Sequence, residues 1–336
     1  MTSAPTPAQP LSYSRPSART WLSGKYVPLL ATLVVCASLY IAAAIRYEYF
    51  FSWGVFINFF RENAALGIVA VGMTFVILSG GIDLSVGSVL GCTGILVATL
   101  TQNGWHPLAA VSLALALGMA LGFAMGSVIH FFKLAPFLVT LAGLFLARGI
   151  ATSISLNSIG LTHDLFRALS EVQLTIAKGV SIPLAAMMFV GVALMAALVA
   201  LFTPFGRNVY AIGGDEHSAV LMGLPVGRTK IAIYTLSGFC AALAGVVYSI
   251  SIGSGNATDG VGLELDAIAA VVIGGTLLTG GVGSVAGTVV GVLILAIITS
   301  ALNFEGSVSS WYARIIIGGL LLIFLVLQKL LTRGKA

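Results

Sequence analysis

Residues 181–203 read SIPLAAMMFVGVALMAALVALFT and contain no charged side chain. A helix needs about 20 consecutive apolar residues to cross the hydrocarbon core of a bilayer. Strands of membrane barrels are shorter and alternate between polar and apolar positions. Because this stretch is long and continuously apolar, it predicts a membrane-spanning α-helix.

Nine further stretches have the same character and are separated by polar residues, glycine or proline. Of the 336 residues, 58% are hydrophobic and 8% are charged, and the mean hydropathy is +1.07. Soluble domains carry roughly 25% charged residues, so this composition suits a surface that faces lipid and excludes a soluble enzyme. We predict an all-α, polytopic membrane helix bundle of about ten transmembrane helices over residues 27–331, with spans at 27–45, 63–79, 85–101, 107–130, 134–155, 181–203, 231–252, 265–279, 285–302 and 313–331.

The two ends of the chain are predicted to lie in the cytoplasm. Residues 1–26 are rich in proline and serine and are expected to form a disordered tail. The apolar run 27–45 exceeds the core of a signal peptide, which has about 7–15 residues, so we interpret it as a retained span. With the N-terminus inside, ten lysines and arginines fall in inside segments and four in outside segments, as the positive-inside rule requires.

Two of the predicted spans are short and end in similar glycine-rich stretches. Residues 78–83 read LSGGID, and residues 278–283 read LTGGVG. Paired interruptions of hydrophobic segments mark the substrate site in transporters that contain internal repeats. We therefore predict broken or re-entrant segments near 79–85 and 279–284, both on the same side of the membrane. The alternative is a coincidence in a chain with 40 glycines.

The first of these breaks contains an acidic residue, which is costly inside a membrane and usually has a partner or a task. Asp83 or Ser85 is expected to cap the helix that follows the break by accepting hydrogen bonds from its free N–H groups. The alternatives for Asp83 are direct contact with substrate and proton transfer.

Other charged and polar residues lie near the predicted outer ends of the spans. Arg148 is expected to pair with Glu264 or Asp266, to extend to the membrane surface, or to line the substrate path. Asn63 and Asn157 could each bond a passing hydroxyl group, or could cap a helix or face solvent. We count all of these, with Asp83 and Ser85, as candidates for the substrate pathway.

The longest predicted cytoplasmic connection runs over residues 204–230. Asp215 and Glu216 suit the first turn of a short helix at 215–222, because the helix dipole favours negative charge there. Ala219, Leu221 and Met222 would then form an apolar contact surface. Such a helix suits docking to a soluble partner, and the alternative is a loop that covers the base of the bundle.

Several motifs of enzymes are missing from the sequence. It contains neither a phosphate-binding loop of the form G-x-x-x-x-G-K-[ST] nor an H-E-x-x-H motif. The three cysteines and four histidines are scattered. We therefore expect a transport component with no ATPase motif, cofactor or metal of its own and no nucleic-acid partner.

Four blocks of the sequence, in the same order, resemble the membrane permease subunits of bacterial ABC sugar importers of the ribose, xylose and galactofuranose kind. The blocks are NAALGIVAVGMT (63–74) with SGGIDLSVGS (79–88), TLAG (140–143) with Arg148 and Gly149, YAIGGDEHSAVLMG (210–223) and ELDAIAAVVIGG (264–275). The resemblance extends over residues 25–331 and is closest to a galactofuranose importer permease.

This resemblance implies a function and a set of partners. The chain would move a monosaccharide, such as galactofuranose, from periplasm to cytoplasm across the bacterial inner membrane by alternating access. An ABC ATPase subunit would bind ATP and magnesium, and a second, different permease subunit would form a heterodimer with this chain. A periplasmic sugar-binding protein would deliver the sugar. Membrane lipid would surround the bundle. The loop 204–230 would couple to the ATPase through Gly213, Gly214, Asp215, Glu216, Ala219 and Gly223.

An ion-coupled secondary transporter of a small polar solute is the alternative function. It would need a buried acid that is joined to a polar coordination path, and Asp83 is the candidate acid.

Overall fold

The computed structural model describes residues 27–177, 180–306 and 311–333, so the predicted tail 1–26 lies outside the described residues. Helices dominate these residues, and the all-α class is confirmed. Ten helices correspond to the ten predicted spans: α1 (Val27–Arg46), α3 (Ala64–Leu78), α4 (Val86–Gln102), α5 (Pro107–Phe132), α6 (Pro136–Ile154), α8 (Leu184–Phe202), α11 (Val226–Ile252), α12 (Leu263–Ile273), α13 (Val285–Glu305) and α14 (Trp311–Arg333).

The lengths of these helices decide how many can cross a membrane by themselves. Within the described residues, α1, α5, α6, α8, α11 and α13 are long and apolar enough. The bent pair formed by α2 (Trp53–Glu62) and α3 can form a seventh span. Since α4, α12 and α14 are not among these candidates, the number of about ten spans remains a prediction.

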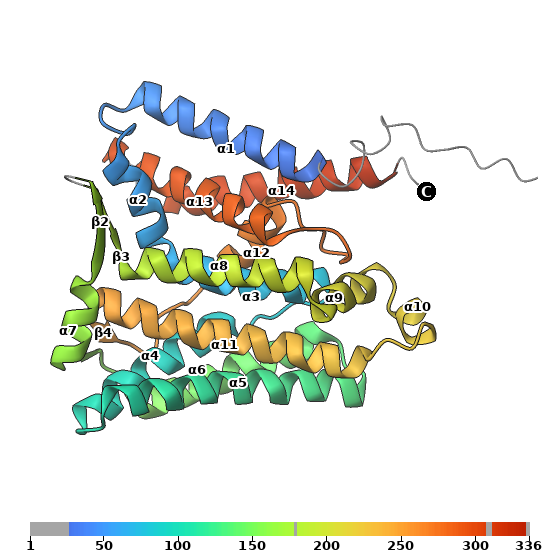
Figure 1. Cartoon of the computed structure of the whole chain (residues 1–336), viewed down its shortest axis with the longest axis horizontal. Helices are drawn as coiled ribbons and strands as arrows, with labels where there is room; N and C mark the ends of the chain where they lie inside the picture. The colour runs from blue at the N-terminus through green and yellow to red at the C-terminus, as the bar shows by residue number, and fades with distance from the viewer. Residues whose placement is uncertain (1–26, 178–179, 307–310, 334–336) are drawn as a thin grey trace, which may run out of the picture.

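Shorter elements gather at the two ends of the bundle (Figure 1). At one end lie α2, α7 (Asp164–Glu171) and the antiparallel hairpin of β2 (Gln173–Ala177) and β3 (Val180–Pro183). At the other end lie α9 (Pro204–Gly214) and α10 (Glu216–Leu221). We call these the α7 end and the α9 end.

The four strands were not predicted. Besides the β2–β3 hairpin, β1 (Ile159–Gly160) pairs with β4 (Ser254–Gly255) in antiparallel register. Each strand has two to five residues and lies in a connection between helices. Such short strands give no recognisable alternation of polar and apolar residues.

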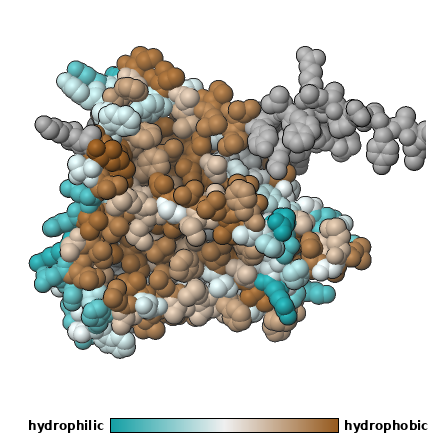
Figure 2. All heavy atoms as spheres, in the orientation of Figure 1, coloured by the Kyte–Doolittle hydropathy of each residue, from teal (hydrophilic) through white to brown (hydrophobic). Residues whose placement is uncertain are grey.

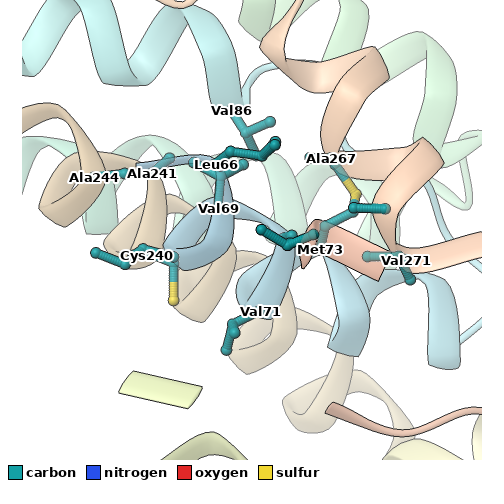
Figure 3. Close-up of a cluster of buried hydrophobic side chains, with 14 of the residues drawn as sticks. Leu66, Val69, Val71, Met73, Val86, Cys240, Ala241, Ala244, Ala267 and Val271 are labelled. Atoms are coloured by element: carbon teal, nitrogen blue, oxygen red, sulfur yellow. The ribbon is translucent and has the colours of Figure 1, made fainter. Parts of the chain in front are cut away.

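The helix α3 forms the centre of the bundle, and all of its residues are buried. A helix that is apolar on every side is expected to be surrounded by protein. Small side chains let its neighbours approach closely. Figure 3 shows these neighbours, which are Cys240, Ala241 and Ala244 of α11 and Ala267 and Val271 of α12.

The surface of the molecule agrees with a position in the membrane. Figure 2 shows hydrophobic side chains over the middle of the visible face and hydrophilic side chains toward the α7 end and around α9 and α10. At the α7 end, Tyr49, Trp53 and Trp105 are 78%, 69% and 49% exposed. Tyrosine and tryptophan favour the membrane–water interface, so this end lies at a membrane surface.

The predicted end of one span at the second glycine-rich break is wrong by several residues. The span predicted to end at 279 ends at Ile273. Gly275, two residues after Ile273, has a φ angle of 90°, a left-handed conformation that glycine adopts readily and that ends helices. The second break therefore covers 274–284, and it is longer than the first.

Candidate functional site

The two glycine-rich breaks meet at the α9 end of the bundle. The backbone N–H of Gly281 donates a hydrogen bond to the carbonyl oxygen of Leu78 over 2.9 Å. Gly280 lies close to Gly80. A Cβ atom added to Gly280 would be 2.8 Å from the backbone nitrogen of Gly80. We call this contact the glycine junction. It joins two stretches that were predicted to share one side of the membrane.

The helix α9 ends against the glycine junction. A Cβ atom added to Gly213 would overlap the carbonyl oxygen of Leu78 and would approach the backbone nitrogen of Gly281. The hydroxyl of Tyr210 donates to the carbonyl oxygen of Gly283 over 3.0 Å. A displacement of α9 would therefore act directly on both breaks.

Asp83 is fully buried in the first break. Its Oδ1 accepts hydrogen bonds from the backbone N–H of Ser85 over 2.9 Å and from the Ser85 hydroxyl over 2.6 Å. Its Oδ2 accepts from the hydroxyl of Ser237 in α11 over 2.7 Å. The predicted cap by Ser85 is wrong, because the Ser85 hydroxyl bonds Asp83 and not the backbone of α4. Asp83 instead ties the break to α11.

Two further side chains contact this region. The hydroxyl of Thr140 in α6 donates to the carbonyl oxygen of Ile82 over 3.2 Å. The hydroxyl of Tyr234 in α11 lies next to Gly81 and has no hydrogen-bond partner among the described residues. Tyr234 and Ser237 were not predicted. Each is a polar residue within an apolar run, and this signal could have found them.

Arg148 is half-buried in α6. Its guanidinium donates to the carbonyl oxygens of Ala257 and Asp259, the latter over 3.0 Å. The carboxylates of Glu264 and Asp259 are close enough to interact with it electrostatically. However, the described residues show no ion pair between Arg148 and Glu264 or Asp266. The predicted pairing is replaced by bonds to the backbone.

The loop 256–262 that receives Arg148 lies against α4. A Cβ atom at Gly87 of α4 would overlap the carbonyl oxygen of Gly260 and the Oε2 atom of Glu264. Glycine at this position thus permits the close approach. Two of the predicted pathway residues, Arg148 and Glu264, are brought together beside α4.

The remaining predicted pathway residues lie in other parts of the fold. Asp266 of α12 interacts electrostatically with Arg314 of α14. The side-chain amide of Asn63 donates to the carbonyl oxygen of Phe59 over 3.0 Å, at a bend of 57° between α2 and α3. Asn157 is exposed in the connection after α6.

The predicted coupling loop 204–230 is mostly helical. It contains α9 and α10, and α11 begins at Val226 and not at 231. Asp215 caps α10 and accepts a hydrogen bond from the backbone N–H of Ser218 over 2.5 Å. This bond lowers the pKa of the Asp215 carboxyl below its ordinary value. Gly223, with a φ angle of 76°, turns the chain toward α11.

The other predicted coupling residues differ in exposure. Glu216 forms an ion pair with Lys230 of α11 over 2.6 Å. Ala219 is fully buried, so it does not belong to the exposed apolar surface that was predicted. Three apolar side chains after it do form such a surface: Val220 (55% exposed), Leu221 (75%) and Met222 (67%).

The described residues contain no group of three histidine, cysteine, aspartate or glutamate side chains that could hold a metal ion. Cys36, Cys92 and Cys240 are free thiols.

Comparison with known proteins decides the family. A family model described as "Branched-chain amino acid transport system / permease component" matches residues 55–325. The chain belongs to this permease family. No solved structure matches it.

Three relatives are similar over most of their length. The inner membrane ABC transporter permease protein YjfF of Escherichia coli K12 is 46% identical over 91% of this chain and 93% of its own. The ribose import permease protein RbsC of Bacillus subtilis is 42% identical over 81% and 84%. The fructose import permease protein FruG of Bifidobacterium longum is 39% identical over 92% of each chain.

These comparisons confirm the resemblance at the level of the family. The relatives are named as permease components and not as ATPases, in agreement with the missing phosphate-binding loop. Their names do not mention galactofuranose, so this sugar remains a prediction.

Proposed function

We propose that the chain is the membrane-spanning permease subunit of an ATP-driven importer of a monosaccharide. The family description refers to branched-chain amino acids. Two relatives with 42% and 39% identity over 81% and 92% of the chain are named for ribose and fructose. Because similarity to individual proteins over nearly the whole chain is more specific than a family description, it favours a sugar.

Transport driven by ATP requires that movement of the ATPase reaches the membrane helices. The contact between α9 and the glycine junction is the observation that best supports such a coupling. The apolar side chains that α10 exposes suit a protein partner. An ATPase subunit that presses on α10 would move α9, since Asp215 joins the two helices. Through Gly213 and Tyr210, α9 would then move both breaks. Closure of the ATPase would in this way shift the position of the helices that adjoin the breaks.

The polar side chains divide into structural and pathway candidates. Asp83 already accepts three hydrogen bonds, so we assign it and Ser85 a structural role. Arg148 and Glu264 lie together beside α4, and both side-chain types bond sugar hydroxyls. We propose that the sugar passes this pair, and we assign no contact with sugar to Asn63, Asn157 or Asp266.

The proposed assembly contains an ABC ATPase that binds ATP and magnesium, a second permease subunit of different sequence and a periplasmic sugar-binding protein. We propose the bacterial inner membrane as its location, with both termini and the α9 end in the cytoplasm. Galactofuranose is the proposed sugar. The proposed coupling residues are Gly213, Gly214, Asp215, Glu216, Ala219 and Gly223.

Two neighbouring glycines provide a matched test of coupling. An alanine at Gly213 would overlap Leu78, whereas the Cβ position of Gly214 has open space around it. In proteoliposomes that contain the complete complex, Gly213→Ala should keep ATP hydrolysis and should lower ATP-driven sugar uptake about tenfold, a change of about 1.4 kcal/mol. Gly214 faces the second break with its backbone only, which lies next to Gly281, so Gly214→Ala should behave as the wild type. Equal uptake by both variants would contradict the role of α9.

The same preparation tests the transport class and the sugar. Uptake of labelled galactofuranose, ribose and fructose is measured with ATP, without ATP, and for the chain alone under a proton or sodium gradient. The proposal expects uptake of one of these sugars that depends on ATP and on all partners. Uptake by the chain alone that is driven by an ion gradient would establish the secondary transporter instead.

A further inference from the structure

Each of the two glycine-rich breaks has a buried hydroxyl that lacks a hydrogen-bond partner. Among the described residues, four buried side-chain oxygens have none, and they belong to Ser88, Tyr234, Ser249 and Thr276. The Tyr234 hydroxyl lies next to Gly81 in the first break, and Thr276 belongs to the second. A buried polar group without a partner destabilises the conformation in which it occurs, and its presence in a native structure calls for an explanation.

Thr276 is fully buried near the start of the second break. The backbone N–H of Leu277 donates to the carbonyl oxygen of Val282 over 2.9 Å. This bond closes the loop, so the residues on its two sides, Thr276 and Gly283, face each other. A Cβ atom added to Gly283 would overlap the hydroxyl oxygen of Thr276. The hydroxyl therefore lies beside the backbone of Gly283 but does not bond it.

The carbonyl oxygen of Gly283 is already bonded to α9. It accepts from the hydroxyl of Tyr210 over 3.0 Å. The proposed coupling requires α9 to move relative to the second break, and such a movement would take the Tyr210 hydroxyl away from this carbonyl. Thr276 is then a buried donor that lies next to Gly283 and has no other bond to give up.

We infer that Thr276 is a further coupling residue, whose hydroxyl takes over the carbonyl oxygen of Gly283 when Tyr210 releases it. While α9 contacts the break, the carbonyl is bonded to Tyr210 and the Thr276 hydroxyl is unpaired. When α9 is displaced, the carbonyl is bonded to Thr276, and the Tyr210 hydroxyl, which is half-buried, can bond water. The carbonyl is thus paired in both positions of α9, which lowers the free-energy cost of moving between them. The inference rests on the proposed role of α9.

Thr276→Val removes the hydroxyl and keeps the size of the side chain. It takes an unpaired group out of the conformation with α9 in contact, and it takes a hydrogen bond out of the conformation with α9 displaced. Both effects favour contact. Thr276→Ser retains the hydroxyl and should behave as the wild type. Thr288 of α13 gives the matched control, because it is equally buried but its hydroxyl oxygen lies 2.7 Å from that of Thr74.

The unfolding temperature of the purified chain in detergent shows whether the Thr276 hydroxyl is unpaired. Thr276→Val should raise this temperature, because it removes a buried group that bonds nothing. Thr288→Val should lower it, because it breaks the bond to Thr74. A lowered temperature for Thr276→Val, or a failure of this variant to fold, would mean that the hydroxyl already has a partner and would overturn the inference.

The position of α9 is measured in the complete complex with and without ATP. Spin labels are attached through Arg207→Cys in α9 and Val282→Cys in the second break, both at exposed positions, after the three native cysteines are replaced by alanine. Pulsed electron paramagnetic resonance gives the ratio of displaced to contacting α9 from the label distances. Thr276→Val should lower this ratio about tenfold, as the exchange of one buried hydrogen bond provides. Tyr210→Phe should raise it, and Thr276→Ser and Thr288→Val should leave it unchanged.

Three results of this measurement would overturn the inference. An unchanged ratio in Thr276→Val would mean that its hydroxyl bonds nothing in either position of α9. An equal fall in Thr276→Ser would mean that packing and not the hydroxyl controls α9. A single label distance in the wild type under all conditions would mean that α9 does not move. Sugar uptake by the wild type separates these failures from a failure of the proposed function: a ratio that shifts as expected without ATP-driven uptake would support Thr276 and contradict the importer.

Discussion

Asp83 shows how a buried acid can be structural. Its three hydrogen bonds come from Ser85 and Ser237. Asp83→Ala would leave these donors without an acceptor, and each buried unsatisfied group costs about 1–3 kcal/mol. We expect Asp83→Ala to lower the unfolding temperature in detergent strongly. Ser237→Ala, which removes one donor, should lower it less.

The transport assay separates this role from contact with sugar. Uptake is divided by the amount of folded protein in the membrane. The rate per folded molecule should be nearly unchanged in Ser237→Ala, because the other two bonds of Asp83 remain. If Asp83→Asn folds as the wild type but loses uptake, Asp83 acts on the sugar, and its structural assignment is wrong.

Arg148 uses geometry as well as charge. The Nη1 atom of the guanidinium donates to two carbonyl oxygens of the loop 256–262. The planar guanidinium fixes the directions of these N–H bonds, whereas the ammonium of a lysine rotates on a flexible stem. We expect Arg148→Lys to loosen the loop and to raise the protease sensitivity of residues 256–262. The exposed Arg167 of α7 gives the control Arg167→Lys, which should leave the cleavage rate unchanged. Equal cleavage of both variants would contradict the role of the guanidinium of Arg148.

The sequence could predict that these residues matter, and it could not predict their partners. Asp83 and Arg148 are conspicuous because charges in apolar segments are rare. Carbonyl oxygens, however, occur in every residue, so the sequence alone favoured the carboxylates Glu264 and Asp266 as partners of Arg148. The hydroxyl partners of Asp83 include Ser237, which is 154 positions away. Its polarity within an apolar run could mark it as a candidate but could not identify Asp83 as its partner.

Among the elements, α10 depends on one capping interaction. Asp215 accepts from the Ser218 N–H, and this bond lowers the pKa of the carboxyl. A lowered pKa in the folded state means that the cap stabilises α10 above the unfolded pKa of about 3.9 and is lost as the pH falls through the lower folded value. Hydrogen exchange of residues 216–221 should therefore report extra opening of α10 in that acidic range.

Asp215→Asn is the matched control for this titration. An asparagine also caps helices but does not ionise, so exchange in α10 should lose this pH dependence, after correction for the intrinsic exchange rate. If the variant keeps the same acid-induced opening, another group controls α10.

The helices were predictable to different degrees because their signals differ in strength. Long apolar runs such as 107–130 and 181–203 match α5 and α8 closely. The end of α12 was misplaced because Leu277 and Leu278 continue the apolar pattern after glycines have ended the helix. The bend between α2 and α3 was not predicted, since Asn63 alone separates them.

At the scale of the whole molecule, the similar breaks 79–85 and 279–284 indicated a shared location but not a contact. That contact depends on how α3 and α12 pack, which no local pattern encodes. The sequence likewise could not show that the end of α9 contacts both breaks. Its two glycines, Gly213 and Gly214, look alike in the sequence, and only the packing of Gly213 against Leu78 distinguishes them.

The assignment of the α9 end to the cytoplasm and of the α7 end to the outside predicts on which side of the membrane each connection between helices lies. If α4 and α12 cross the membrane as α5 does, the turns at Asn103 and Ser158 lie outside, and those at Leu134 and His217 lie inside. A variant with Cys36, Cys92 and Cys240 replaced by alanine would carry one new cysteine at each of these exposed positions. A membrane-impermeant maleimide should label positions 103 and 158 in intact cells.

Positions 134 and 217 should react only after the membrane is permeabilised, which makes them the internal control for positions 103 and 158. Ten spans and the proposed orientation require this pattern. Labelling of position 103 only from inside would mean that α4 enters and leaves the membrane on the cytoplasmic side. Labelling of 217 in intact cells would place α10 outside, where it could not reach an ATPase, and the proposed coupling would be wrong together with the orientation.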